Sequence, residues 1–139
     1  TPKPSSAASD VYKRQMLERN NWHPTLLEIK SSIEFITSQK YNSVLANYYR
    51  DGSDSMGWHS DDESMLDKDS AIASVSLGQE RPLHFKHKNQ DISFAIDQSH
   101  GSVIVMDGDT QKYWKHCIKK SKKLMKPRLN LTFRTIITS

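Results

Sequence analysis

The chain has 139 residues, of which 35% are hydrophobic and 26% are charged, and its formal net charge is +4 at pH 7. A chain of this length forms one domain with a modest core, and its positive charge permits a polyanionic partner without requiring one. Its single cysteine, Cys117, excludes an intrachain disulfide and is typical of an intracellular protein, with nucleus and cytoplasm both open. No apolar run is long enough to span a membrane, so no membrane association is expected.

Residues 1–15 are rich in Ser, Ala, Pro and Lys and show no sustained periodicity. We expect them to form a disordered or non-native leader, of the kind that vector or adapter sequence adds, and we exclude them from the fold. The folded domain is expected to cover residues 21–139.

Apolar side chains recur at three- and four-residue spacing from residue 26 to residue 37, which predicts an amphipathic helix on the outside of a sheet. From residue 43 the pattern changes to that of strands. The expected strands cover residues 43–50, 71–77, 83–88, 92–96, 102–106, 113–118 and 128–138. Many short strands and one helix predict a mainly β fold, a double-stranded β-helix (jelly roll) with an outer supporting helix.

His59 and Asp61 lie two positions apart in a loop or short strand. On an extended backbone their side chains leave on the same side. With a third nitrogen ligand from elsewhere they would form two histidines and one carboxylate on one face of a metal, the set that suits non-haem Fe(II). Alone, this spacing is a weak signal, because such pairs also occur on solvated loops.

Residues 128–134 alternate strictly between polar and apolar side chains. The polar face carries Arg128 and Arg134 with Asn130 and Thr132 between them. One interpretation is an ordinary strand whose polar face lies in water. The other is a cavity lining that holds a dianion, because a planar guanidinium binds a carboxylate through two hydrogen bonds. With the metal ligands, the second interpretation indicates 2-oxoglutarate.

Four motifs in this order resemble those of the AlkB family of Fe(II)/2-oxoglutarate dioxygenases, nearest to the eukaryotic homologues that repair DNA. They are the segments 47–52 (Asn-Tyr-Tyr-Arg-Asp-Gly), 58–63 (Trp-His-Ser-Asp-Asp-Glu), 71–78 (Ala-Ile-Ala-Ser-Val-Ser-Leu-Gly) and 127–134 (Pro-Arg-Leu-Asn-Leu-Thr-Phe-Arg). The resemblance covers about residues 21–138 and leaves residues 1–15 unmatched. It implies a domain truncated at its N-terminal side, with much of the family's lid over the target base missing.

The resemblance implies that His59, Asp61 and His116 are the metal ligands and carry the catalysis. The alternatives to His116 are His84, His87 and His100. The first two cannot share a strand face, and His100 precedes a glycine in what reads as a turn. His116 stands where the family places its distal ligand.

By the same resemblance, Asn47 and Tyr49 bind the carboxylates of 2-oxoglutarate. Arg128 is the partner of the distal carboxylate, with Asn130 and Tyr49 assisting. Arg134 approaches the carboxylate nearer the metal.

Asp62 and Glu63 are the predicted contacts to the target base, because a carboxylate complements the amine or cationic edge of a methylated base. The alternative is two solvated acids. Five lysines between residues 119 and 126 are either a solvated loop or phosphate contacts. Trp58 is expected to pack in the core or beside the ligands rather than to stack on a base.

The implied activity is oxidative demethylation of 1-methyladenine and 3-methylcytosine in DNA, with RNA open, using Fe(II), 2-oxoglutarate and O2. The products are formaldehyde, succinate and CO2. The expected partner is alkylated nucleic acid, and the expected state is a monomer. Two alternatives remain: the same iron chemistry on RNA or protein, and a catalytically defective fragment.

Overall fold

The computed structural model describes residues 13–18 and 22–137. Nine strands and two helices follow one another within these residues. They are β1 (Lys13–Glu18), α1 (Pro24–Thr37), β2 (Ser43–Tyr49), β3 (Met56–His59), β4 (Ile72–Gly78), β5 (Arg81–His87), β6 (Ser93–Gln98), β7 (Ser102–Met106), α2 (Gly108–Tyr113), β8 (Trp114–Ile118) and β9 (Arg128–Arg134). Among the described residues, no helix is long and apolar enough to cross a membrane.

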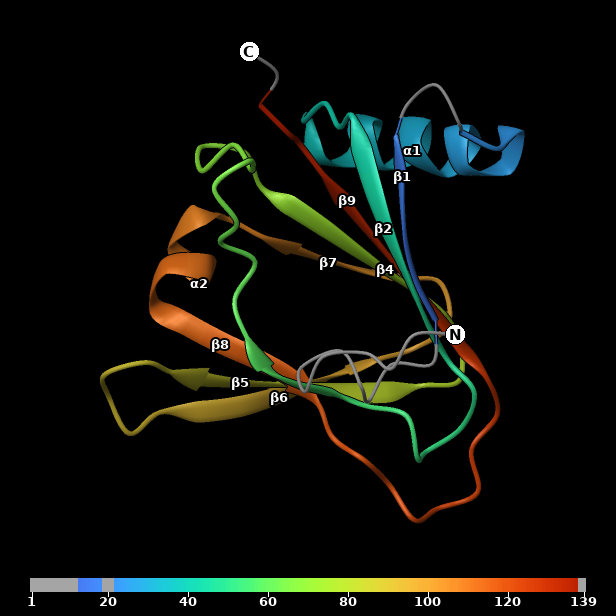
Figure 1. Cartoon of the computed structure of the whole chain (residues 1–139), viewed down its shortest axis with the longest axis vertical. Helices are drawn as coiled ribbons and strands as arrows, with labels where there is room; N and C mark the ends of the chain where they lie inside the picture. Colours follow the sequence, from blue (N-terminus) through green and yellow to red (C-terminus); the bar gives the residue numbers. More distant parts are fainter. Residues whose placement is uncertain (1–12, 19–21, 138–139) are drawn as a thin grey trace.

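The strands form two antiparallel sheets that face each other (Figure 1). The large sheet has the order β1-β2-β9-β4-β7, and the small sheet has the order β3-β8-β5-β6. Strands distant in sequence are neighbours in both sheets, and α1 lies against the outer face of the large sheet (Figure 1). This arrangement is the predicted jelly roll with an outer supporting helix.

Two apolar clusters hold these layers together. One lies between α1 and the large sheet and includes Ile33, Val44 and Phe133. The other lies between the sheets and includes Met56, Phe85 and Met106. On β9 the alternation of side chains sends apolar residues toward α1 and polar residues between the sheets. The second cluster is therefore interrupted by a polar region, which contains the site described below.

The structure bears on three of the expectations. The sequence predicted one helix, but α2 is a second; its N-cap Asp107 accepts a hydrogen bond from the backbone N–H of Thr110. The predicted leader overlaps the sheet, because β1 begins at Lys13 and pairs with β2. Residues 1–12 of that leader lie outside the described residues. Finally, the structure supports the second of the two interpretations of residues 128–134: the polar face of β9 is buried, since Arg128, Asn130, Thr132 and Arg134 are at most 7% exposed.

Candidate metal and 2-oxoglutarate site

His59, Asp61 and His116 meet between the sheets at one end of the small sheet. His59 ends β3 and is the direct antiparallel partner of His116 on β8. Asp61 follows two residues after His59. One ligand atom from each of the three side chains can be chosen so that all lie within 4.8 Å of one another. Such a separation is compatible with a single metal ion held by two imidazoles and one carboxylate.

Hydrogen bonds orient the ring of His59 and hold the backbone of Asp61 in position. The Nδ1 of His59 lies 2.7 Å from the carbonyl oxygen of Gly57. Because a carbonyl only accepts, Nδ1 carries the proton and Nε2 is left for a metal. The backbone N–H of Asp61 donates to Oε1 of Gln111 on α2 at 2.8 Å, which holds the loop after β3 in place.

The electrostatic surroundings keep Asp61 ionised. Burial raises the pKa of Asp61, but the hydrogen bond and charge of His116, together with His59 and Arg134, lower it to about 2. The Nε2 of His116 lies 3.5 Å from Oδ2 of Asp61. A carboxylate charged at neutral pH is the form that binds a metal cation.

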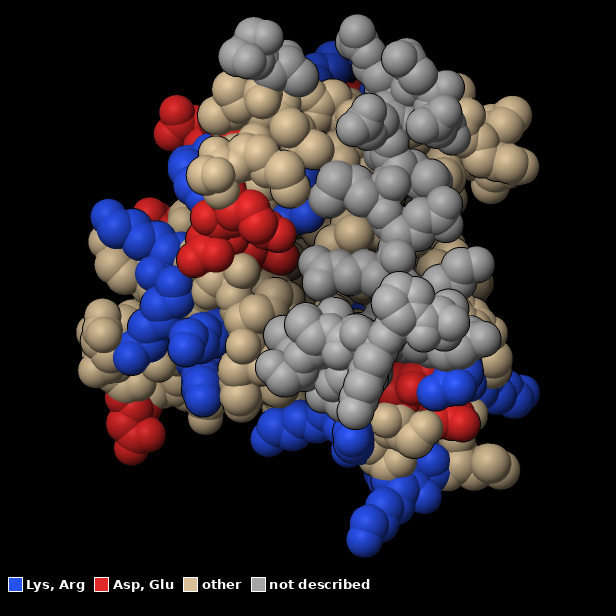
Figure 2. Space-filling view, in the orientation of Figure 1, with Lys and Arg blue, Asp and Glu red and all other residues tan. Residues whose placement is uncertain are grey.

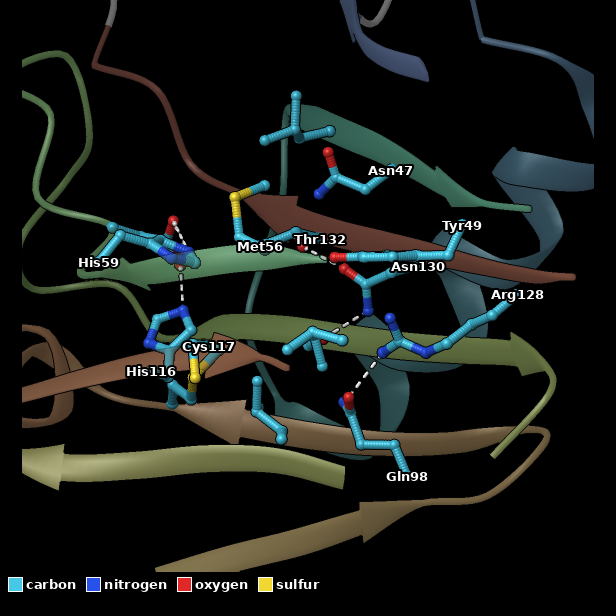
Figure 3. Close-up of a pocket in the computed structure, with 16 residues that line it drawn as sticks. Asn47, Tyr49, Met56, His59, Gln98, His116, Cys117, Arg128, Asn130 and Thr132 are labelled. Carbon is cyan, nitrogen blue, oxygen red and sulfur yellow. Dashed lines mark hydrogen bonds and ion pairs between the residues drawn. The ribbon is translucent and has the colours of Figure 1, made fainter. Parts of the chain in front are cut away.

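A cavity extends from these ligands between the two sheets toward Arg128 (Figure 3). Arg128 is buried, its Nε donates to Oγ of Ser76 at 2.9 Å, and its Nη2 donates to Oε1 of Gln98 at 2.6 Å. The ring of Tyr49 lies 5.0 Å from the guanidinium carbon. Nη1 of Arg128 is buried without a hydrogen-bond partner among the described residues. A carboxylate in the cavity would satisfy it.

Arg134 stands at the metal end of the same strand. Its side chain is fully buried, and its Nη2 lies 2.9 Å from Oε2 of Glu63 and 3.7 Å from Oδ1 of Asp61. Its Nε and Nη1 have no hydrogen-bond partner within the described part of the chain. Arg128 thus lines the cavity, and Arg134 lies beside Asp61 at its metal end. Two buried guanidiniums with unsatisfied N–H groups fit a dianion such as 2-oxoglutarate.

The remaining predicted cosubstrate residues line the same cavity but differ in which hydrogen-bonding groups are still without a partner. Asn47 has a buried Oδ1 without a partner among the described residues. Asn130 donates both amide hydrogens within the sheet, to Ser74 and to the carbonyl of Val75. In this arrangement Asn130 braces β9 against β4 and has no donor left for a carboxylate.

The two predicted base contacts lie in different surroundings. Asp62 is exposed and lines a second cavity of about 410 Å³, beside Asp61 and Gln111. That volume lies within the range of small-molecule sites. Glu63 accepts a hydrogen bond from Arg134, and its side chain is 40% exposed.

Sequence reasoning missed Gln98, Ser76 and Gln111, which are buried and hold the site residues. Glutamine and serine are ordinary in strands and short helices, so no local pattern singled them out. The expectation for Trp58 was wrong in part: the side chain is 37% exposed and does not belong to the core.

The fold and the site are compatible with binding of Fe(II) and 2-oxoglutarate, and the comparisons with known proteins agree. The chain belongs to the 2OG-Fe(II) oxygenase superfamily, whose family model matches residues 3–134, and it is similar to AlkB homologues. This match includes residues 3–15, which the four motifs left unmatched.

Two curated relatives illustrate the similarity. The chain is 41% identical over 136 residues to alpha-ketoglutarate-dependent dioxygenase alkB homolog 3 of Bos taurus, covering 91% of this chain and 48% of that protein. It is 39% identical over 124 residues to DNA oxidative demethylase ALKBH2 of Homo sapiens, covering 84% of this chain and 48% of that protein. The chain thus spans about half the length of these relatives.

A solved structure shares the fold. The structure of OsALKBH1 superposes with a TM-score of 0.57 at 27% identity, over 78% of this chain and 61% of that one.

Proposed function

We propose that the protein is an Fe(II)/2-oxoglutarate-dependent dioxygenase that removes methyl groups from N-alkylated nucleobases, with 1-methyladenine and 3-methylcytosine in DNA as the favoured substrates. The observation that carries the proposal is the meeting of His59, Asp61 and His116 beside the cavity that Arg128 lines. When bound, Fe(II) with 2-oxoglutarate and O2 supplies the oxidising chemistry, which yields succinate, CO2 and formaldehyde.

The residues of the chain contribute positioning and charge. Nη1 of Arg128 would donate a hydrogen bond to the distal carboxylate of 2-oxoglutarate, while the unpartnered N–H groups of Arg134 would face the carboxylate nearer the metal. The buried surroundings strengthen these charge-assisted hydrogen bonds and exclude water.

The second cavity, beside Asp62, supports the choice of a nucleobase as substrate. It adjoins Asp61, so a flat ring bound there would present a methyl group toward the metal ligands. A base in a duplex cannot reach this point without leaving its stack, and the cost is lowest for single strands and for bases whose pairing is already blocked by methylation. The curated relative ALKBH2 is named a DNA oxidative demethylase, which also favours DNA.

The test is an assay of the purified protein with Fe(II), ascorbate and 2-oxoglutarate. We expect formaldehyde and succinate from an oligonucleotide that carries 1-methyladenine or 3-methylcytosine, and no turnover by His59→Ala. Methylated RNA and methylated peptides serve as comparison substrates. Faster turnover of a peptide than of any oligonucleotide would overturn the substrate assignment, and full activity of His59→Ala would overturn the metal assignment.

A further inference from the structure

The outward face of the small sheet carries three lysines around one exposed tryptophan. Lys86 on β5 and Lys115 on β8 are direct cross-strand partners, and Lys119 follows the end of β8. The ammonium of Lys86 lies 4.4 Å from the centre of the Trp58 ring, and that of Lys119 lies 6.0 Å from it. We call these four residues the lysine–tryptophan face.

The lysines of this face repel one another when no ligand is bound. Like charges directly opposite each other on neighbouring strands repel, and no ion pair within the described residues involves Lys86, Lys115 or Lys119. Burial lowers the pKa of the neighbouring His84, the charge of Lys119 lowers it further, and the charge of Asp97 raises it. Such a cluster is complementary to a polyanion.

A bulge in β3 creates the exposed ring. Met56 pairs with Ile118 and His59 pairs with His116, so Gly57 and Trp58 together stand opposite a single residue of β8. Met56 and His59 can then both face the interior while Trp58 turns outward to the lysines. One irregularity thus places a metal ligand and an exposed aromatic ring on opposite faces of the same strand.

From these observations we propose that the lysine–tryptophan face binds the segment of single-stranded nucleic acid that flanks the target base. The lysines would contact phosphates, and the indole would stack on an unpaired base. An acidic protein surface would also bind the lysines, but it would not account for the exposed Trp58 ring. The inference rests on the proposed function and extends it to a second contact region.

The position of the face allows one strand to reach both regions. β3 is an edge strand of the small sheet, so a polynucleotide can pass around it from the metal site to the outward face. Figure 2 shows lysine and arginine side chains gathered over α2 and the neighbouring ends of β5 and β8, beside the acidic group over the loop after β3. Positive charge therefore borders the region that contains the metal ligands.

The first experiment measures binding of an unmethylated single strand of about 16 nucleotides, a length at the upper end of single-strand sites, over a series of salt concentrations. We expect the double variant Lys86→Gln/Lys115→Gln to bind more weakly and to flatten the slope of log K against log salt by about 1.4, because each lost phosphate contact removes about 0.7. Lys40→Gln, a matched control on a lysine whose side chain is 91% exposed, is expected to leave the slope unchanged. An unchanged slope in the double variant would overturn the inference.

The second experiment tests the ring. Trp58→Ala is expected to weaken binding of the same strand by about 5- to 150-fold, while Trp58→Phe retains most of the affinity because it keeps an aromatic face. Equal loss in both variants, or loss in neither, would exclude stacking. Thermal unfolding of each variant shows whether the fold is intact.

A methylated trinucleotide separates failure of this inference from failure of the proposed function, because it reaches the metal site but is too short for the face. Turnover of the trinucleotide by wild type and by the double variant alike, with weaker binding of the long strand by the variant alone, supports the inference. No turnover by wild type of the methylated trinucleotide or of a methylated version of the long strand would refute the demethylase function. Turnover without any difference in long-strand binding would refute the lysine–tryptophan face alone.

Discussion

Arg134 and Glu63 are 71 residues apart in sequence, yet Nη2 of Arg134 donates to Oε2 of Glu63 at 2.9 Å. The bond links β9, which lines the cosubstrate cavity, to the loop that carries Asp61. It also gives Glu63 a role in holding the site together, next to the base contact that the sequence suggested.

Loss of this bond is expected to destabilise the protein. Glu63→Ala leaves an N–H of a fully buried guanidinium unpaired, so we expect the free energy of unfolding to fall by about 1–3 kcal/mol. Asp62→Ala removes the adjacent, exposed carboxylate and should change the free energy of unfolding by less than about 0.5 kcal/mol. Urea unfolding of the two variants provides the measurement. Equal stability of the two would show that the bond contributes nothing.

Metal binding is expected to stabilise the fold through three ligands. Mn(II) with 2-oxoglutarate at about 100 times the dissociation constant should add about 2.7 kcal/mol to the free energy of unfolding and raise the melting temperature. His116→Ala should abolish this gain, whereas His84→Ala, which alters a rival histidine outside the site, should retain it. A gain that survives His116→Ala would remove His116 from the ligand set.

Acid should weaken the metal-free protein through Asp61. Its folded-state pKa is lowered from 3.8 to about 2, so the unfolded state binds more protons between these values and stability falls as the pH drops through that window. Above pH 3.8 the carboxylate contributes on the order of 2 kcal/mol to the free energy of unfolding, and this contribution is lost toward pH 2. Asp61→Asn should show a smaller loss over the same range in urea titrations. Parallel pH profiles for the two proteins would contradict the assignment.

Arg128 is expected to recognise 2-oxoglutarate through the shape of its guanidinium. Arg128→Lys keeps the positive charge but cannot hold Ser76 and Gln98 while also binding a carboxylate with two hydrogen bonds. We expect the dissociation constant for 2-oxoglutarate, measured by calorimetry with Mn(II), to rise about tenfold or more. Arg50→Lys, at a residue that pairs with Asp54 outside the cavity, should leave the dissociation constant unchanged.

Gly52 is expected to be essential for docking of the loop that contains the five lysines from Lys119 to Lys126. A methyl group on Gly52 would overlap the carbonyl oxygen of Ser121, whose backbone N–H donates to the Gly52 carbonyl at 2.8 Å. Gly52→Ala should therefore lower the urea midpoint, while Gly57→Ala, where the added methyl group meets nothing within 4 Å, should not. Indistinguishable midpoints would mean that the loop shifts at no cost.

Local patterns in the sequence determined the elements and several site residues. The alternation from Arg128 to Arg134 identifies a strand, and because side chains in a strand alternate between faces, it also assigns the two arginines to one face. The same rule places His59 and Asp61 together. The short helix α2 was not predicted, because six residues are too few to show a helical period.

Only the tertiary structure decided which groups meet across the sheets. Periodicity assigns a residue to one face of a strand but does not determine whether that face is exposed or buried. The polar face of β9 is buried because the small sheet packs against it. The register of β3 on β8 selects His116 among the histidines, and Gln98 and Glu63 find their arginines through neighbouring strands and loops. These contacts depend on distances between segments far apart in the chain, which no local pattern contains.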